Sequence, residues 1–161
     1  MATTREKEIT LADEIETTEL YLNIENIRFS NEIEYSVTVD KSLNFNTIKI
    51  PCLILQPFIE NAIWHGLSSK KGLKKLNIII KKDKPSHVKI SIIDNGIGRV
   101  RSGEINKYKT LKKDSIGIKL TKERLNNFFK DYQNSYSIAF TDLYINKTSK
   151  GTKVTLKIPL K

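Results

Sequence analysis

Apolar and polar residues follow a helical period near the start of the chain and a strand period soon after it. From 11 to 28, apolar side chains recur with the spacing of an amphipathic helix. They are Leu11, Ile15, Leu20, Leu22, Ile24 and Ile27. Thr10, followed by Asp13 and Glu14, indicates a helix cap with acids in the first turn. Residues 33–39, IEYSVTV, predict a strand.

A second helix is predicted from Pro51 to His65. Proline suits the first turn of a helix, and Gly66 indicates where this helix stops. The pattern then predicts two strands joined by the turn DKPS, a polar loop, a third helix, and two closing strands with Gly151 at their turn. In order, these segments are 76–82, 87–94, 95–115, 116–130, 136–145 and 152–158.

The order of these elements predicts the fold class. Strands and helices do not alternate as they do in a doubly wound parallel sheet, and 161 residues suit a single domain. We therefore predict an α+β two-layer sandwich, in which about three helices cover one face of a mixed, largely antiparallel sheet.

The chain carries a formal net charge of +10. This balance permits a polyanionic partner, such as nucleic acid, an anionic membrane surface or a phosphate-bearing ligand. Because lysines are spread along an Ile- and Asn-rich chain, the pattern instead favours lysines that merely solvate the surface. The single cysteine, Cys52, excludes an internal disulfide and suits a reducing cytoplasm. No apolar run approaches membrane-spanning length, and the first residues do not resemble a signal peptide.

Polar residues interrupt the second predicted helix, QPFIENAIWHG. Its apolar residues recur at three- and four-residue spacing and should face the core. Glu60 and Asn61 stand in its middle, and His65 follows one turn later. An Asn carbonyl oxygen suits a hard cation such as Mg²⁺, and a Glu could bind an outer-shell water or accept a proton. Alternatively, Glu60 and Asn61 are surface residues and His65 caps the helix.

Three further segments carry candidate chemistry. SIIDNGIGR places Asp94 at a strand end, before two glycines that let the backbone approach a ligand closely, although Asp-Asn-Gly also forms plain turns. SIGIKLTKERL places Gly117 just inside a predicted helix start, where free N–H groups favour phosphate. GTKVTLKIP opens the final strand with a Gly-Thr pair.

In this order and at these separations, the four segments resemble the nucleotide-binding domain of histidine kinases, the Bergerat fold shared with gyrase B and MutL. The resemblance is greatest to kinases of the LytS type. LQPFIENAIWHG resembles the N box, DNGIG the first glycine box, SIGIKLTKERL the second, and the Gly-Thr pair the closing element. The segment TLADEIETTELYLNIENIRF resembles the lead-in to the domain. The resemblance therefore covers the chain from about Ile9 to Pro159.

The resemblance implies a domain that binds ATP with Mg²⁺. Asn61 would coordinate the Mg²⁺ that bridges the phosphates, and Glu60 would act nearby, as a base toward the phospho-accepting histidine or as an organiser. Asp94 would accept a hydrogen bond from the adenine amino group, with support from Thr152. His65 would lie near the nucleotide. The glycines that would shape the pocket and its lid are Gly96, Gly98 and Gly117.

The basic stretch between the glycine boxes resembles the mobile ATP lid of that family. Its cations are Arg99, Arg101, Lys107, Lys109, Lys112 and Lys113. Cations there can meet triphosphate charge, and we expect one or two of them to do so, although a solvated loop would carry the same residues.

The sequence departs from the family pattern at several positions. Trp64 stands where these kinases usually have a lysine that contacts phosphate. Ser115 replaces the first glycine of the second box, and Leu120 replaces a common Asn. Pro57 stands where ATPase relatives have a water-activating glutamate, which argues for phosphoryl transfer or plain binding over hydrolysis.

We therefore expect residues 1–161 to form one ATP-binding catalytic domain of a LytS-type two-component sensor histidine kinase. Residues 1–30 would be a lead-in helix from a missing dimerisation and phosphoacceptor region. The domain would transfer the γ-phosphoryl group to a histidine on a separate helical domain, and a response regulator would then receive it. Neither His65 nor His87 lies in a segment resembling the phosphoacceptor, so the chain alone is not expected to autophosphorylate. The parent would be a membrane-anchored bacterial sensor, with this domain in the cytoplasm and membrane contact only through missing segments.

Two other functions are open at this point. Trp64 and the altered second glycine box favour a degenerate nucleotide-binding or interaction module that does not catalyse transfer. The charge favours a nucleic-acid-binding domain, but a recognised motif and a stripe of aromatic and basic residues are both missing from the sequence, so we expect no nucleic-acid partner.

Overall fold

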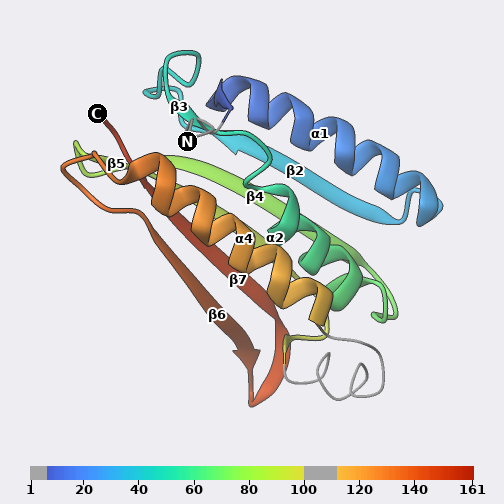
Figure 1. Ribbon diagram of the computed structural model, residues 1–161. Coiled ribbons are helices and arrows are strands. Elements are labelled where there is room, and N and C mark those ends of the chain that lie inside the picture. Colours follow the sequence, from blue (N-terminus) through green and yellow to red (C-terminus); the bar gives the residue numbers. More distant parts are fainter. Residues whose placement is uncertain (1–6, 100–111) are drawn as a thin grey trace.

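The computed structural model describes residues 7–99 and 112–161 of the chain. In chain order its elements are β1 (Glu8–Thr10), α1 (Leu11–Arg28), β2 (Ile33–Val39), β3 (Lys49–Pro51), α2 (Gln56–Asn61), η1 (Ala62–Leu67), β4 (Lys74–Asp83), β5 (His87–Asp94), α4 (Lys112–Phe129), β6 (Ser137–Ile145) and β7 (Thr148–Pro159). Figure 1 shows α1, α2 and α4 on the same side of a sheet whose strand order is β2-β4-β5-β7-β6. Strand β2 pairs with β4 in parallel, and the other neighbours are antiparallel. The predicted fold class is confirmed.

Helix α1 begins where the sequence predicts. The side chain of Thr10 accepts a hydrogen bond from the backbone N–H of Asp13 at 3.0 Å, and the Asp13 carboxylate accepts one from the N–H of Thr10 at 3.4 Å. Together these bonds form a capping box. Strand β1, directly before the helix, pairs with β3, and neither of these short strands was predicted. Residues 8–28 are thereby built into the domain.

The predicted apolar stripe of α1 is only half correct. Leu11, Ile15 and Leu22 are buried in the core, as expected. However, Leu20, Ile24 and Ile27 are 57%, 58% and 69% exposed. Residues two apart on a helix point about 200° away from each other, so Leu20 and Leu22 cannot face the same core.

The second predicted helix begins later and ends differently. Pro51 ends strand β3 instead of opening a helix, because its backbone pairs with Glu8 of β1. A turn then intervenes, and α2 starts at Gln56. After Asn61 the helix widens into the π-helical turn η1, whose last bond runs from the Ser68 N–H to the Ile63 carbonyl at 2.8 Å. Gly66 therefore lies inside the helical segment and does not stop it.

Two later boundaries also differ from the prediction. Helix α4 begins at Lys112, which places Gly117 inside the helix instead of at its start. Strand β7 begins at Thr148, because Asn146 and Lys147 form the turn with positive φ angles of 51° and 65°. Gly151 therefore lies within β7, opposite Leu143 and next to an irregularity in the pairing.

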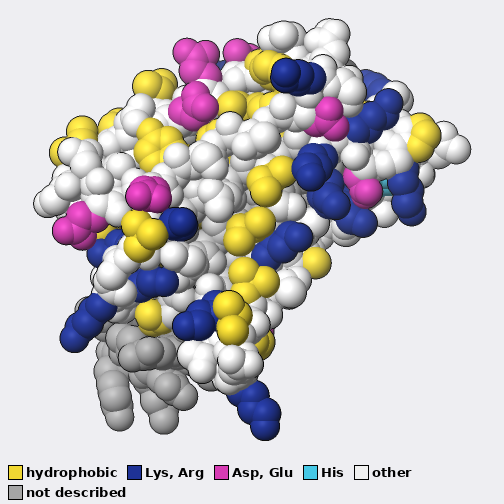
Figure 2. Space-filling view, turned by 180° about the vertical axis from the view of Figure 1, so that it is seen from behind, with side chains coloured by type: hydrophobic (Ala, Val, Ile, Leu, Met, Phe, Trp, Pro, Cys, Tyr) yellow, Lys and Arg dark blue, Asp and Glu magenta, His cyan; other side chains and the backbone are white. Residues whose placement is uncertain are grey.

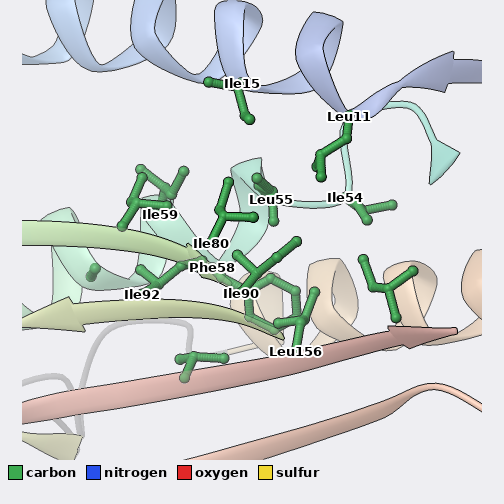
Figure 3. Packing of buried hydrophobic residues seen from close by; sticks show 14 of the residues in the cluster. Leu11, Ile15, Ile54, Leu55, Phe58, Ile59, Ile80, Ile90, Ile92 and Leu156 are labelled. Carbon is green, nitrogen blue, oxygen red and sulfur yellow. The ribbon is translucent and has the colours of Figure 1, made fainter. Parts of the chain in front are cut away.

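The core lies between the helices and one face of the sheet, as Figure 3 shows for part of it. Alternate residues of the central strands, among them Ile80, Ile90 and Leu156, point into it. Phe58 of α2 is completely buried against them, and Leu55, Ile59 and Ala62 are buried too, as the sequence predicts. None of the described helices covers the other face of the sheet. Among the described residues, the helices are too short or too polar to cross a membrane.

Candidate functional site

Asp94 ends strand β5 with a buried carboxyl group. The residue is 4% exposed, and its Oδ1 accepts a hydrogen bond from the Gly96 N–H at 2.8 Å. The backbone N–H of Thr152, its partner on β7, also donates to the carboxyl group. Burial raises the pKa of Asp94 to about 6, although these two N–H groups and the positive charge of Lys70 act against the rise. The carboxyl group is therefore mostly ionised at neutral pH, in a place that favours a hydrogen-bond donor.

Gly66 and Gly96 allow the helix and the strand end to meet. A methyl group on Gly66 would lie 2.7 Å from Oδ1 of Asp94. A methyl group on Gly96 would lie 2.3 Å from the carbonyl carbon of Gly66. The Ile97 N–H donates to the Gly66 carbonyl at 3.0 Å across the same contact. Larger residues would force the helix and the strand end apart. The sequence predicted Gly96 as a close-approach glycine but assigned Gly66 only to a helix stop.

Asn95 fixes the turn that follows Asp94. Its side chain donates to the Leu73 carbonyl at 3.0 Å and accepts from the Lys75 N–H at 2.7 Å. The Lys70 ammonium donates to its backbone carbonyl at 2.6 Å. Sequence reasoning did not single out Asn95 or Lys70 as site residues. An Asn between an aspartate and a glycine was the signal for a turn, but its long-range partners cannot be identified from the local sequence.

The closing strand lies against the same turn. Thr152 is buried opposite Asp94 on the neighbouring strand. Gly98 has a φ of +85°, and a methyl group there would lie 1.9 Å from Oγ of Ser149. The segments around Gly66, Asp94 and Thr152 therefore form one continuous site.

Asn61 and Glu60 face different surroundings. Asn61 is half-buried, and within the described part of the chain its side chain makes no hydrogen bond. Glu60 accepts a hydrogen bond from the side chain of Gln56 at 3.0 Å. The pKa of Tyr21 on α1 is raised, mainly by burial and further by the charges of Glu25 and Glu60. Glu60 therefore lies near α1, whereas the Asn61 amide has no hydrogen-bond partner among the described residues. His65 is half-buried one turn later, in η1.

This site combines a buried hydrogen-bond acceptor with an amide that has no partner among the described residues. The acceptor can select a ligand that carries an amino group. The amide oxygen can complete the coordination of a hard cation. The three sides of the site come from η1, the end of β5 and β7.

Sequence comparison places the chain among bacterial sensor proteins. It is 33% identical over 141 residues to YwpD of Bacillus subtilis (strain 168), which covers 87% of this chain and 46% of that protein. It is 29% identical over 152 residues to the sensor histidine kinase BtsS of Escherichia coli (strain K12), covering 94% of this chain and 24% of BtsS. The sensor protein LytS of Enterococcus faecalis is 28% identical over 152 residues, covering 94% of this chain and 25% of LytS. The chain thus spans less than half the length of these relatives. No protein-family model matches it.

Solved structures identify the fold of the shared region. The histidine kinase domain of the blue-light activated kinase EL346 from Erythrobacter litoralis superimposes with a TM-score of 0.62 at 17% identity, covering 99% of this chain and 66% of that one. The mycobacterial sensor histidine kinase MprB gives 0.62 at 14% identity, covering 96% and 97%. The chain is a relative of the LytS-type sensor histidine kinases. The region that it shares with them has the fold of a histidine kinase catalytic domain.

Trp64 has a structural partner in this domain. Its ring lies 5.4 Å from the ring of Phe29 and its side chain hydrogen-bonds to Tyr21, both contributed by the C-terminal half of α1 and its cap. Trp64 is nevertheless 44% exposed. The residue that replaces the usual lysine of LytS-type kinases therefore attaches the η1 turn to α1.

Gly117 lies opposite the start of α2. The nearest atom to a methyl group built on it would be Cβ of Pro57, at 3.9 Å. The Gly117 carbonyl accepts a hydrogen bond from the buried Thr121 hydroxyl at 3.0 Å. Because Gly117 is not at the helix start, its N–H is not among the free N–H groups that the sequence predicted there. Leu120 is exposed on the same helix.

Arg99 is bound to Asp142. Its Nε and Nη2 donate to the two carboxylate oxygens at 2.8 and 2.9 Å, and its guanidinium lies 5.3 Å from the centre of the Phe140 ring. This pair uses two of the five guanidinium N–H donors, so Arg99 could contact a nucleotide through the others without breaking the pair. Among the other predicted lid cations, Arg101, Lys107 and Lys109 lie outside the described residues.

Proposed function

We propose that this domain binds ATP with the adenine base at Asp94. The buried carboxylate would accept a hydrogen bond from the exocyclic amino group, with Thr152 beside it. The close contact between Gly66 and Asp94 would leave one edge of the carboxyl group for the base. Gly96 and Gly98 would shape the adjoining wall of the pocket, with His65 near the nucleotide.

From the adenine base at Asp94, the phosphates would extend toward Asn61. Asn61 fits a Mg²⁺ ligand, because its amide has no other partner among the described residues and Mg²⁺ prefers oxygen. Within the described residues, no cluster of three or more acidic, His or Cys side chains could hold a metal ion alone. Phosphate oxygens and waters would therefore supply most of the coordination. The cation would neutralise phosphate charge during transfer.

The whole protein would use this domain as a sensor kinase. The γ-phosphoryl group would pass to a histidine on a separate helical dimerisation domain, with Glu60 as a base or an organiser nearby. A response regulator would then receive the group. A structure of the kinase ThkA in complex with the response regulator TrrA has this fold at a TM-score of 0.57, which supports such a partner. We place the domain on the cytoplasmic side of a membrane-anchored sensor, and we expect residues before it to provide the helical domain.

One observation carries the proposal: Asp94 is a buried carboxylate, held by two backbone N–H groups at the meeting point of three motif segments. The two N–H groups and the nearby charge of Lys70 only partly offset the cost of burying this carboxylate, which supports a role beyond a structural one. Perturbed carboxyl groups in such places mark functional sites.

The decisive experiment is a titration of the domain with ATP, with and without Mg²⁺. Asp94→Asn should abolish binding, because its amide offers a donor where the base needs an acceptor. Asn61→Ala should bind ATP but lose the dependence on Mg²⁺. Asp83→Asn, a change at the far end of the sheet, is a control that should bind like the wild type. Failure of the wild type to bind millimolar ATP would end the proposal.

Transfer is tested separately from binding. The domain, loaded with radiolabelled ATP, is mixed with the isolated helical domain of a LytS-type relative that carries a histidine. Labelling of that partner by wild type but not by Asn61→Ala supports a catalytic domain. Binding without labelling would support the alternative, a nucleotide-binding module that does not catalyse transfer, for which the replacement of a phosphate-contacting lysine by Trp64 is the specific reason.

A further inference from the structure

The face of the sheet opposite the helices carries a cross-strand row of lysines. Alternate residues of a strand point to opposite faces, and this face is the one turned away from the core. The pairing places Lys81 of β4 opposite Lys89 of β5, and Lys89 opposite Lys157 of β7. Lys153 lies further along β7, opposite Ile93. Figure 2, which looks from behind the helices, shows Lys and Arg side chains spread over this side of the molecule.

Such a row is unfavourable in an isolated domain. Like charges directly opposite each other destabilise a sheet, and neighbouring strands are only about 4.8 Å apart. Lys157 is offset by Asp83, whose Oδ2 lies 3.3 Å from its Nζ. Within the described part of the chain, Lys89 and Lys153 form no ion pair, and Lys81 has only a longer-range attraction to the carboxylate of Asp40. The repulsion along the row is therefore only partly offset inside the domain.

The surroundings of the row determine what could bind it. In the central strands this face also carries Asn77, Ile79, Ser91, Ile93 and Thr155, with Lys75 at one end and Asp83 and His87 at the other. Rings of Phe, Tyr and Trp, on which nucleic acid bases stack, and arginines, which bind phosphates in a fixed geometry, are absent from this face in the described strands. Lysines on flexible stems instead suit diffuse attraction to a broad anionic surface.

We propose that this face docks on the surface of an anionic phospholipid membrane. Lys81, Lys89 and Lys153 would lie among the headgroups, and the helices and the Asp94 site would face away. Each lysine near an anionic surface strengthens binding about fivefold, so three give a weak, salt-sensitive contact. It would matter most for a domain held close to the membrane by other parts of its protein. The inference does not depend on ATP binding.

Vesicle co-sedimentation tests whether this face binds an anionic membrane. The 161-residue chain is mixed with vesicles of phosphatidylcholine alone or with added phosphatidylglycerol, at low and at physiological salt. One variant combines Lys81→Gln, Lys89→Gln and Lys153→Gln, which removes charge but keeps side-chain length. The matched control combines Lys119→Gln, Lys122→Gln and Lys130→Gln, at exposed positions on and directly after α4, on the helix side of the sheet. Urea unfolding checks that both variants fold.

The wild type should bind only the anionic vesicles, and less as salt rises. The sheet-face variant should bind at least tenfold more weakly than the wild type, and the control variant should bind within about twofold of the wild type. Equal losses in the two variants would mean that total charge and not this face binds the membrane. Absence of wild-type binding at low salt would also overturn the proposal. So would tighter binding to duplex DNA than to the vesicles at the same salt.

Discussion

Gly66 lies directly against the carboxylate of Asp94, so the two residues must be considered together. A methyl group on Gly66 would approach Oδ1 to 2.7 Å and Cγ to 3.1 Å. The contact joins the helical segment that carries Asn61 to the strand end that carries the buried acid. π-Helical turns occur frequently at functional sites, and here the turn is where the helix meets the strand end.

Gly66→Ala should therefore damage both the fold and the site. Overpacking of this kind costs about 1–3 kcal/mol in the free energy of unfolding, and displacement of Asp94 should weaken ATP binding at least tenfold. Urea unfolding and an ATP titration measure the two effects. Gly117→Ala is the control for unfolding, because its new methyl group would meet only Cβ of Pro57 at 3.9 Å. Normal stability and binding in Gly66→Ala would show that the contact is not required.

Asp94 should make the stability of the domain depend on pH. Burial raises the pKa of Asp94 in the folded state to about 6, from its ordinary value of 3.8. The folded state therefore holds this proton between pH 4 and 6, where the unfolded state has released it. Stability from this group is highest below pH 4 and is lost as the pH rises to 6, by at most about 3 kcal/mol.

Comparison with Asp94→Asn isolates this contribution. The free energy of unfolding is measured from pH 4 to 7 in both proteins, because other carboxyl groups titrate as well. The difference, wild type minus variant, should fall as the pH rises and level off above 6. ATP binding by the wild type should weaken as the pH drops below 6, because a protonated carboxyl group is a poorer acceptor. A constant difference across the range would contradict the raised pKa.

Glu14 should stabilise the start of α2 from a neighbouring helix. Its carboxylate on α1 accepts hydrogen bonds from the backbone N–H groups of Leu53 at 2.9 Å and Leu55 at 3.1 Å. Glu14→Ala leaves these groups unpaired, and we expect a loss of roughly 2–4 kcal/mol in the free energy of unfolding. Urea unfolding measures it, with the exposed Glu16→Ala as a control that should change stability by less than about 0.5 kcal/mol. Equal losses of stability at both positions would show that the hydrogen bonds from Leu53 and Leu55 to Glu14 do not stabilise the start of α2.

The fold was predictable where the local sequence pattern and the tertiary contacts favour the same element. The capping residues at Thr10 and the alternation along β4 and β5 gave elements close to those observed. The start of α2 was mispredicted because Pro51 fits a helix start equally well, and only its pairing with β1 determines otherwise. The exposed half of the α1 stripe shows that an apolar residue need not be buried.

The candidate site was predictable in its motif residues but not in its supports. Asp94, Gly96 and Thr152 stand in motifs that the sequence displays, and the structure brings them together. The contact of Gly66 with Asp94 joins residues far apart in the chain, so periodicity cannot reveal it. The same holds for Glu14, which was assigned only to the first turn of its own helix.

Gly117→Ala should separate a structural role from a ligand-binding role on α4. Within a helix, alanine is favoured over glycine by about 0.5–1 kcal/mol, and the added methyl group has room beside Pro57. The variant should therefore be slightly more stable than the wild type in urea unfolding. If the backbone at Gly117 lies against the bound nucleotide, the same methyl group should weaken ATP binding several-fold. Asn127→Ala, near the far end of the helix, serves as the control for general changes in α4. Increased stability of Gly117→Ala with unchanged ATP affinity would place the nucleotide away from this turn of α4.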